Sequence, residues 1–441
     1  MAKPVVAIVG RPNVGKSAFF NYIAGQRISI VEDTPGVTRD RIYTTSDWRG
    51  KQFTIIDTGG IEPKGNSEIL KQMQIQAQIA IDTADVIILL VNIKDGMTSA
   101  DKDVADILYR SGKKVVVAVN KVDQVGDVPN EFYEFYNLGL GEIFPISSLH
   151  GLGIGDLLDE VYNNFPEAIE EEEDENLIKV AIIGKPNAGK SSLINNILRE
   201  DRVIVSNIPG TTRDAIDSTV SRNGKKYIFI DTAGVRRRSK VYDNIEKYSV
   251  LRAWTAIERA DVCILLIDAL DGVTEQDTKI AGYAHEAGKG VIIAINKWDL
   301  IEKDNKSYKK YTDEAKRKLI FMLYAPITTI SAKTGKRVED FFQMIDDVYE
   351  SCTKRVSTGV LNDVLNEAVA MVQPPADRGR RLKIYYMTQA AIKPPTFVLF
   401  INSKKLFHFS YERYLFNQIR EAFGFVGTPI RFIVKEKEKI K

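Results

Sequence analysis

The sequence has 441 residues, which at roughly 150 residues per domain predicts about three domains, and its formal net charge of +2 indicates no particular partner. A hydrophobic fraction of 44% and a charged fraction of 27% allow each domain to bury a core and exclude a disordered chain. Two cysteines cannot form a disulfide framework, and the apolar runs are far shorter than the ~20 residues of a membrane span. We therefore expect a reduced, cytoplasmic protein with no secretory signal and no membrane partner.

Apolar runs alternate with helical patterns along the first 165 residues. Buried strands are predicted at Val5–Val9, Val86–Val91 and Val115–Val119, and helices at Ile69–Ile81 and Val104–Arg110. Further on, strands are again predicted at Val180–Ile183, Val262–Ile267 and Val291–Ile295. This alternation is typical of an α/β fold in which helices cover both faces of a mostly parallel sheet.

A long internal repeat defines the domains. The segment Ala7–Ser17 (AIVGRPNVGKS) returns as Ala181–Ser191 (AIIGKPNAGKS), 174 positions later, which is far longer than a solenoid period. Two whole domains of common ancestry are therefore predicted, joined by a glutamate-rich, extended linker. The predicted boundaries are 1–165 for the first domain, 166–177 for the linker, 178–352 for the second domain and 353–441 for a basic third domain.

Each repeat opens with the pattern G-x-x-x-x-G-K-[ST], between a predicted strand and a predicted helix. Glycines let backbone N–H groups surround phosphates, and the helix N-terminus adds its positive dipole end. Lys16 and Lys190 are expected to reach the β- and γ-phosphates, and the Ser17 and Ser191 hydroxyls to bind Mg²⁺. The predicted phosphate loops comprise Gly10, Arg11, Pro12, Asn13, Val14, Gly15, Lys16 and Ser17, and Gly184, Lys185, Pro186, Asn187, Ala188, Gly189, Lys190 and Ser191.

A D-x-x-G pattern follows each loop at the same distance, because Asp57 and Asp231 both lie 47 residues after the first loop glycine. Each aspartate is expected to hold Mg²⁺ through a water, and the N–H of Gly60 or Gly234 to sense the γ-phosphate. The predicted segments are Asp57, Thr58, Gly59, Gly60 and Ile61, and Asp231, Thr232, Ala233, Gly234 and Val235. Ile61 and Val235 occupy the position at which Ras-type sites have a glutamine that orients the attacking water, so another device is needed.

The base is predicted from two N-K-x-D patterns at the ends of later strands. A carboxylate at Asp123 or Asp299 can accept from both N1–H and the N2 amino group of guanine, whereas adenine offers neither donor. A backbone N–H one strand later can meet guanine O6. The predicted base-binding residues are Asn120, Lys121, Asp123, Ser147 and Ser148, and Asn296, Lys297, Asp299, Ser331 and Ala332.

Thr38 and Thr212 lie 28 residues after the first loop glycine of their repeats, on glycine-containing segments. A threonine there can ligate Mg²⁺ only while a γ-phosphate is present, which gives an order–disorder switch. The residues expected to act in catalysis are Lys16, Thr38, Gly60, Lys190, Thr212 and Gly234. The expected Mg²⁺ residues are Ser17, Thr38, Asp57, Ser191, Thr212 and Asp231.

The region from residue 353 differs in charge from the rest of the chain. It has 16 Lys and Arg against 7 Asp and Glu, a net +9, and leaves −7 for the preceding part. This asymmetry favours a phosphate-rich partner or a solvated basic tail equally. The predicted order is helix, strand, strand, helix, strand, at Val360–Val372, Leu382–Thr388, Thr396–Ile401, Tyr411–Phe423 and Pro429–Val434.

Two features of this region bear on RNA. Its one GXXG match, Gly424–Gly427, lies between a helix and a strand, so we interpret it as a helix cap and turn and not as an RNA clamp. The aromatic residues around Tyr385, Phe400 and Phe409 are predicted to belong to the core. Contact with RNA is therefore expected through charge or shape, and the basic residues of this region include Arg378, Arg380, Arg381, Lys383, Lys404 and Lys405.

Over nearly its whole length the chain resembles the bacterial tandem GTPases called Der or EngA (double Era-like GTPase), which have two GTPase domains, an acidic linker and a basic KH-like domain. The resemblance implies GTP and GDP as ligands with Mg²⁺, and hydrolysis coupled to late assembly of the large (50S) ribosomal subunit, with rRNA as a partner. In related GTPases a loop asparagine ligates K⁺, so Asn13 and Asn187 are candidate K⁺ ligands. Alternatively each asparagine only braces its loop.

Other interpretations remain open at this point. One domain can hold nucleotide statically while the other turns over, which would make the protein chiefly a nucleotide-gated scaffold. A GTPase serving a membrane or tRNA-modifying partner is a third hypothesis. The basic segment Val235–Lys240 suits rRNA, a partner domain or solvent. Slow intrinsic turnover and a monomeric state are expected.

Overall fold

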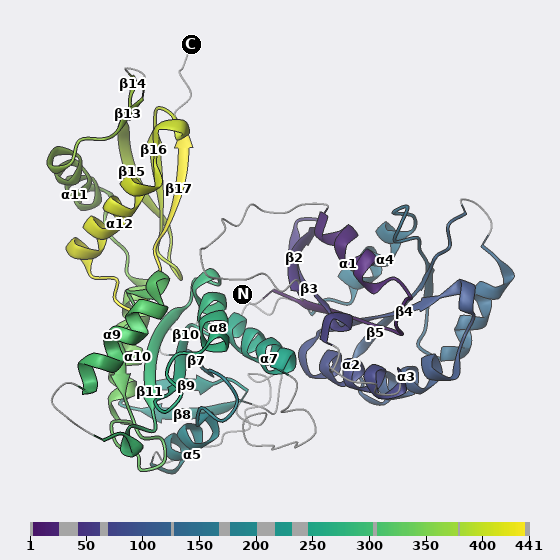
Figure 1. Ribbon diagram of the computed structural model, residues 1–441. Helices are drawn as coiled ribbons and strands as arrows, with labels where there is room; N and C mark the ends of the chain where they lie inside the picture. The colour runs from purple at the N-terminus through teal and green to yellow at the C-terminus, as the bar shows by residue number, and fades with distance from the viewer. Residues whose placement is uncertain are drawn as a thin grey trace. The chain divides into compact units, whose positions relative to one another are not determined.

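The computed structural model describes residues 3–25, 43–61, 69–124, 128–166, 177–200, 217–231, 246–302, 307–377 and 380–436. The chain divides into two compact units, of which one contains the first repeat together with residues 240–252, and the other contains the rest of the second repeat with the C-terminal region (Figure 1). Each repeat is a sheet covered by helices, which confirms the predicted α/β class. In the described ranges, no helix combines the length and apolarity that crossing a membrane requires.

The first repeat is a six-stranded sheet in the order β2-β3-β1-β4-β5-β6. Only β2 is antiparallel to its neighbour. Its elements are β1 (Val5–Val9), α1 (Lys16–Gly25), β2 (Tyr43–Trp48), β3 (Lys51–Asp57), α2 (Ile69–Thr83), β4 (Val86–Asn92), α3 (Ser99–Arg110), β5 (Lys114–Asn120), β6 (Ile143–Pro145) and α4 (Ile154–Asn163), with 3₁₀ turns at Thr58–Ile61, Ile93–Asp95 and Asn130–Leu138. Strand β1 pairs with β3 on one side and with β4 on the other, so the strand order changes direction at β1. A crevice is therefore expected at the carboxyl end of β1.

The second repeat has the same topology, read as β8-β9-β7-β10-β11-β12. Only β8 is antiparallel to its neighbour. Its elements are β7 (Leu177–Ile183), α5 (Lys190–Glu200), β8 (Ser218–Arg222), β9 (Lys225–Phe229), α7 (Glu246–Arg259), β10 (Val262–Asp268), α8 (Glu275–Glu286), β11 (Gly290–Asn296), α9 (Ser307–Lys318), β12 (Ile327–Thr329) and α10 (Asp340–Thr353), with 3₁₀ turns at Trp298–Leu300 and Ile320–Met322. Matching strand orders confirm the duplication inferred from the sequence.

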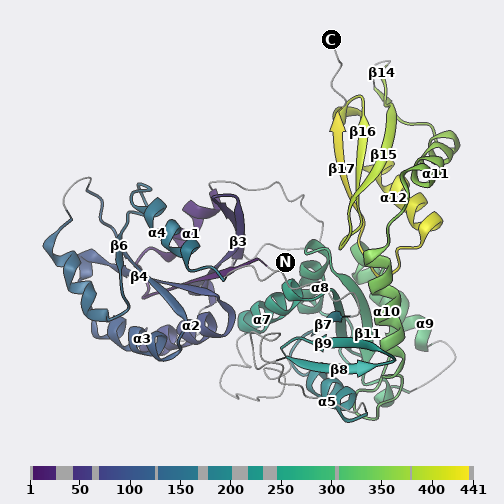
Figure 2. The ribbon, with the colours of Figure 1, turned by 180° about the vertical axis from the view of Figure 1, so that it is seen from behind.

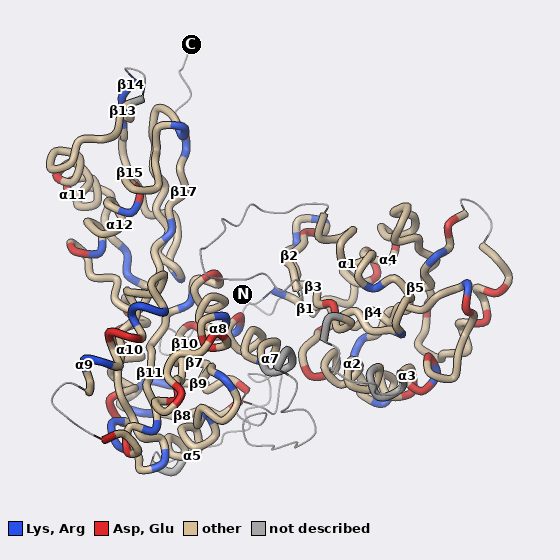
Figure 3. The backbone as a smooth tube through the Cα atoms, in the orientation of Figure 1, with Lys and Arg blue, Asp and Glu red and all other residues tan. Residues whose placement is uncertain are grey.

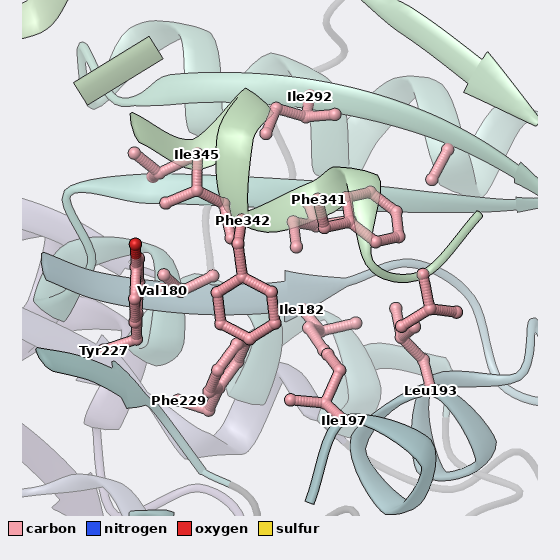
Figure 4. Close-up of a cluster of buried hydrophobic side chains, with 14 of the residues drawn as sticks. Val180, Ile182, Leu193, Ile197, Tyr227, Phe229, Ile292, Phe341, Phe342 and Ile345 are labelled. Atoms are coloured by element: carbon pink, nitrogen blue, oxygen red, sulfur yellow. The ribbon is translucent and has the colours of Figure 1, made fainter. Parts of the chain in front are cut away.

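The central strands form because their residues are mostly aliphatic, many of them β-branched, and buried on both faces. All seven residues of β4 and of β10 are buried, as expected of central strands between two layers of helices. In the second repeat, Phe342 of α10 packs its ring edge-on against Tyr227 at 4.9 Å between ring centroids, over Val180 and Ile182 of β7 (Figure 4). The core thus fixes the sheet, and the sheet fixes the loops at its edge.

The C-terminal domain adds a three-stranded sheet in the order β15-β16-β17. Its elements are α11 (Thr358–Met371), β13 (Ala376–Asp377), β14 (Arg380–Arg381), β15 (Ile384–Ala391), β16 (Thr396–Ile401), α12 (Phe409–Phe423) and β17 (Arg431–Glu436), with a 3₁₀ turn at Lys404–Leu406. Helices α11 and α12 lie on one side of these strands (Figure 2). This order confirms the predicted helix, strand, strand, helix, strand pattern and adds the small hairpin β13–β14.

The C-terminal domain is joined to the second repeat by backbone hydrogen bonds. The amide of Val291 donates to the carbonyl of Gly427 at 2.7 Å, and the amide of Gly427 donates to the carbonyl of Tyr324 at 2.8 Å. The side chain of His285 lies 2.8 Å from the Tyr324 hydroxyl, and the Arg420 guanidinium lies over the Tyr324 ring at 4.8 Å. Gly424 caps α12 with a φ of 87°, so the interpretation of this GXXG segment as a cap and turn is confirmed.

The prediction that the aromatic residues of this domain are buried is wrong in part. Phe400 is partly buried, but Tyr385 is 48% exposed and Phe409 is 76% exposed. The period of a strand does not reveal whether a second layer covers it, and here helices cover one side of the sheet.

Candidate active sites

Both phosphate loops lie where the topology predicts a crevice, directly after the first strand of each repeat. In the first repeat β1 ends at Val9 and α1 begins at Lys16, and in the second β7 ends at Ile183 and α5 begins at Lys190. The intervening residues carry the predicted glycines. Backbone amides at the start of a helix therefore face the carboxyl edge of the sheet in each copy.

The two loop lysines adopt the same conformation. Lys16 donates from Nζ to the carbonyls of Gly10 and Arg11, both at 2.7 Å, and its side chain is buried. Lys190 donates to the carbonyls of Gly184 and Lys185, again both at 2.7 Å. Each ammonium group is thus held across the mouth of its own loop, where a phosphate oxygen can replace a carbonyl as acceptor.

The second glycine of each loop is required by space and by backbone geometry. Gly15 has a φ of 103° and Gly189 a φ of 102°, which side-chain-bearing residues rarely adopt. A Cβ atom would lie 2.3 Å from Asn120 Nδ2 at Gly15, and 2.2 Å from Asn296 Nδ2 at Gly189. The loop can therefore lie this close to the N-K-x-D asparagine only with glycine at that position.

The asparagine of N-K-x-D connects the phosphate loop to the segment that is predicted to meet the base. Asn120 donates from Nδ2 to the carbonyl of Val14 at 2.7 Å, and its Oδ1 accepts from the amide of Ser148 at 2.9 Å. In the second copy Asn296 donates to the carbonyl of Ala188 at 2.8 Å and accepts from the amide of Ala332 at 2.9 Å. Three segments distant in sequence are thereby fixed together in each copy. Direct contact of either asparagine with a base remains a prediction.

The aspartate that is predicted to recognise the base is stabilised as an anion in the first copy. Asp123 accepts from the Ser147 hydroxyl at 2.8 Å and from Lys94 Nζ at 2.9 Å. These two hydrogen bonds, first to Lys94 and then to Ser147, lower the pKa of the Asp123 carboxyl below its ordinary value. In the second copy Asp299 and Ser331 line a small cavity of about 120 Å³ together with Trp298. The lysine at the Lys94 position is replaced there by Leu270.

Oxygen donors suited to Mg²⁺ converge in the first copy. The Ser17 hydroxyl donates to Asp57 Oδ2 at 3.1 Å, and Asp57 Oδ1 accepts from the amide of Gly59 at 2.9 Å. A hydroxyl and a carboxylate at this separation fit the hard, oxygen-preferring ion. In the second copy Asp231 has a left-handed backbone with a φ of 56°, and its amide donates to Asp217 Oδ1 at 2.9 Å.

The loop asparagines Asn13 and Asn187 are both exposed and both left-handed, with φ values of 66° and 62°. Within the described ranges, neither side chain makes a hydrogen bond to the protein. The bracing alternative considered above is thus not supported by a bond in this structure, whereas an exposed amide oxygen at the loop surface suits an ion ligand.

Arg11 and Lys185 turn their side chains away from the loop mouth. Arg11 Nε donates to Asp101 Oδ1 at 3.0 Å and NH2 lies 3.5 Å from Asp95. Lys185 pairs with Asp271, the counterpart of Asp95, at 2.7 Å. Their backbone amides remain the groups that can meet phosphate.

Sequence reasoning missed Asp95, Asp101 and Asp271, the carboxylates that pair with these side chains. Thr98 and Asp101 form a capping box at the start of α3, and Thr274 and Asp277 form the same box at the start of α8. The signal was present, because the T-x-x-D pattern occurs in both copies at equivalent positions. Lys94 left no such signal, since the second copy lacks it.

Some predicted site residues lie outside the described ranges, namely Thr38, Thr212, Thr232, Ala233, Gly234 and Val235. Arg378 and most of the predicted acidic linker lie outside them as well. Gly60 and Ile61 are described through their backbone, which forms a 3₁₀ turn after β3. Their roles remain predictions.

Family profiles and curated relatives agree with this architecture. A family profile described as a 50S ribosome-binding GTPase matches residues 5–121 and again 179–297, and one described as the C-terminal KH-domain-like region of EngA bacterial GTPase enzymes matches 355–435. Curated proteins named GTPase Der from Ruminiclostridium cellulolyticum, Acetivibrio thermocellus and Agathobacter rectalis are 67%, 65% and 59% identical, over 100% of this chain and of each relative. Among solved structures, Era in complex with MgGDPNP and nucleotides 1506–1542 of 16S ribosomal RNA is 22% identical with a TM-score of 0.30, over 60% of this chain and 94% of that one.

Proposed function

Because the chain belongs to the Der (EngA) family of bacterial GTPases, we propose that it is a GTP-hydrolysing switch in the assembly of the large (50S) ribosomal subunit. In this proposal it binds rRNA or the pre-ribosomal particle in a nucleotide-dependent way, in the cytoplasm and as a monomer. Family membership establishes a GTPase that binds GTP and GDP with Mg²⁺. The observation that best supports two working sites is that Lys16 and Lys190 donate in the same way to carbonyls of their own loops.

The chain's own residues account for nucleotide binding in each copy. Loop amides would bind the phosphates, and Lys16 or Lys190 would exchange a loop carbonyl for a phosphate oxygen. Asp123 or Asp299 would accept from the guanine N1–H and N2 donors, and the amide of Ser148 or Ala332 lies on the segment that meets O6. Asn120 and Asn296 hold these segments against the phosphate loop by hydrogen bonds. The parts that would recognise the base and the phosphates are therefore linked to each other.

Ser17 and Asp57 would hold Mg²⁺ in the first copy, with Ser191 and Asp231 as their counterparts and Thr38 and Thr212 as further proposed ligands. The ion, when bound, neutralises phosphate charge that builds up during transfer. The Ser17–Asp57 contact at 3.1 Å prepares this oxygen pair, and the Gly59 amide orients the same carboxylate.

We further propose that K⁺ stimulates an otherwise slow turnover. Ile61 and Val235 cannot orient water, and Asn13 and Asn187 present exposed amide oxygens beside the phosphate site. Turnover in KCl and NaCl at matched ionic strength tests this proposal. Faster turnover in KCl that is lost in an Asn13→Ala, Asn187→Ala double variant supports it, and equal rates in the two salts contradict it.

The main experiment measures nucleotide occupancy and ribosome binding together. Calorimetry on the full chain should show two GTP sites and no ATP binding of similar strength. Lys16→Ala and Lys190→Ala should each remove one site and its share of turnover. If all turnover survives in one of these variants, the scaffold hypothesis with one static site is correct instead.

Ribosome binding is tested by co-sedimentation with purified large subunits in the presence of GDP or a non-hydrolysable GTP analogue. We expect retention with the analogue and release with GDP. Equal sedimentation in both nucleotides would contradict the switch, and absence of binding in both would contradict the proposed partner.

A further inference from the structure

The sheet of the C-terminal domain has one open face. Phe397, Leu399 and Ile401 of β16 point into the core formed with α11 and α12. Alternation then directs Val398 and Phe400 to the opposite side. Tyr386 of β15 and Lys435 of β17 are both in register with Phe400, so these three side chains share the open face.

A β-bulge places two tyrosines on that face. The pairing of β15 with β16 shifts between Ile384 and Tyr386, so Tyr385 and Tyr386 together oppose Phe400. The Tyr386 and Phe400 rings stack at 4.3 Å between centroids with 14° between their planes. Tyr385 is 48% exposed and Tyr386 is 40% exposed. We call Tyr385, Tyr386 and Phe400 the aromatic shelf.

Positive charge surrounds the aromatic shelf. Lys435 is exposed in register with Phe400, and Lys383 is exposed between the core residues Leu382 and Ile384, which places it on the same face. The three strands contain one carboxylate, Glu436, which is in register with the inward-facing Ile401. Figure 3 shows further cationic segments at β14 and along β17. Exposed basic residues near the strand ends are Arg380, Arg381, Lys404 and Lys405.

The GXXG segment is already used within the molecule. Both the amide and the carbonyl of Gly427 bond to the second GTPase domain, through Tyr324 and Val291. A Cβ atom at Gly427 would lie 2.3 Å from Val348 Cγ2, so this end of the turn is packed against α10, whereas Gly424 and Val426 line a cavity of about 430 Å³. Gly427 therefore cannot take part in a GXXG clamp in this arrangement.

The end of the open face that lies beside the second GTPase domain is also occupied by contacts within the molecule. Arg431 is in register with Thr396 at that end, and its guanidinium donates to the carbonyl of Glu286 in the second GTPase domain. Thr396 and Val398 are buried. Accessible aromatic surface is therefore confined to the half of the sheet that carries the aromatic shelf and Lys435.

We propose that the aromatic shelf binds unpaired bases of single-stranded RNA by stacking, while Lys383 and Lys435 hold the adjacent phosphates. Stacking on aromatic side chains tolerates any base, because every base has a π-face, and lysines beside the rings add the charge that phosphates need. The inference rests on the proposed function, which supplies RNA as the partner. It differs from an RNA clamp at GXXG in both surface and physics.

The test uses the full chain and a short fluorescein-labelled oligo(rA), with affinity measured by anisotropy over a range of salt concentrations. Replacing both tyrosines, Tyr385→Leu with Tyr386→Leu, should weaken binding by at least about tenfold, because each stacked base contributes about 1–3 kcal/mol. The dependence on salt should not change, since no charge is removed. Lys383→Gln with Lys435→Gln should instead lower the slope against log salt, by about 0.7 for each lost phosphate contact.

Two controls make the result specific. Tyr386→Phe keeps the ring and should bind like the unchanged protein, and Phe409→Ala removes a ring that is 76% exposed on α12, away from the open face. Near-normal oligo(rA) affinity in the double tyrosine variant, or an equal loss in Phe409→Ala, would overturn the aromatic shelf as an RNA site. A protein-docking role would give that first result together with altered GTP turnover.

Failure of this inference is distinguishable from failure of the proposed function. GTP-dependent co-sedimentation with large subunits that persists while the double tyrosine variant binds oligo(rA) normally would leave the function standing and remove the aromatic shelf. Conversely, a shelf-dependent affinity for oligo(rA) without any subunit binding would leave the RNA site and remove the ribosomal partner.

Discussion

Helices α3 and α8 occupy the same position in the two GTPase domains, but their C-terminal ends meet different surroundings. Tyr109 at the end of α3 is 71% exposed, whereas its counterpart His285 is mostly buried against Tyr324. A Cβ at Gly112 would meet nothing within 4 Å, and one at Gly288 would lie 2.7 Å from Pro394. At the phosphate-loop edge, by contrast, the hydrogen bonds of the loop lysine and of the N-K-x-D asparagine are the same in the two domains. The two copies thus agree at the phosphate loop and differ at the far end of this helix, which in the second copy contacts the C-terminal domain.

The largest effects are expected from Gly15→Ala and Gly189→Ala, which test whether the phosphate loops of the two copies are equivalent. Each substitution forces a side chain into a φ near 102° and against the N-K-x-D asparagine, so the two should fail equally. Strain of about 1–3 kcal/mol from the backbone, with the clash added, should reduce GTP affinity of the altered site by more than about 100-fold. Calorimetry in each single variant measures this, and a mild effect in only one copy would break the equivalence.

The stability of the C-terminal end of α8, which contacts the C-terminal domain, should depend on pH. The exposed C-terminal end of α3 should show no such dependence. Burial, aided by Arg431 and Arg420, lowers the pKa of His285 to about 4. The group is neutral in the folded state and takes a proton on unfolding below its ordinary pKa of about 6.5, so stability is complete above that pH and is lost as pH falls toward 4. The loss should reach about 3 kcal/mol.

Hydrogen exchange at the Val291 and Gly427 amides, corrected for intrinsic rates, measures this loss between pH 7 and 4.5. His285→Gln should flatten the dependence, because the remaining facing groups (Tyr324, Arg420 and Arg431) do not titrate in that range. If His285→Gln showed the same pH dependence as the unchanged protein, a group other than His285 would be responsible for it.

A matched glycine pair isolates the docking contact from backbone strain. Gly112 and Gly288 have φ values of 70° and 73°, so alanine at either position costs about 1 kcal/mol from conformation alone. Gly288→Ala should cost a further ~1–2 kcal/mol through contact with Pro394. We expect faster proteolysis between the second GTPase domain and the C-terminal domain only in Gly288→Ala. Equal behaviour of the two variants would mean that the contact yields without cost.

The smallest expected difference concerns Arg11 and Lys185. Arg11 reaches both Asp95 and Asp101, whereas Lys185 reaches Asp271 and leaves Asp277 Oδ1 buried without a hydrogen bond in the described part of the chain. Lys185→Arg should therefore stabilise the start of α8 by about 1 kcal/mol, and Arg11→Lys should destabilise α3 by a similar amount. Exchange rates of the first-turn amides of the two helices should move in opposite directions, and a shift of the same sign in both would contradict the comparison.

Much of this organisation was predictable because it depends on local period. The runs Val86–Val91 and Val262–Ile267 fall within one residue of β4 and β10, since strands buried on both faces are continuously apolar. The phosphate loops were predictable because glycine and lysine spacing encodes their geometry. The burial of His285 against Tyr324 and the hydrogen bond from Lys94 to Asp123 depend on neighbours distant in sequence. A hydrophobic period does not predict such contacts.

Tyr385 shows a different limit. A bulge moved it to the same face as Tyr386, and an alternating pattern assumes that no residue is inserted. The single helical layer over this sheet then left both tyrosines exposed. The prediction that Tyr385 belongs to the core failed for these two reasons together.

The paired backbone bonds at Gly427 also determine how the molecule can be dissected for study. An expression fragment truncated after α10 would uncover the Val291 amide, the Tyr324 carbonyl and the packed side of Val348, and would tend to self-associate. The piece to produce in isolation therefore runs from β7 through β17, with the C-terminal domain retained as a structural cap of the GTPase that precedes it.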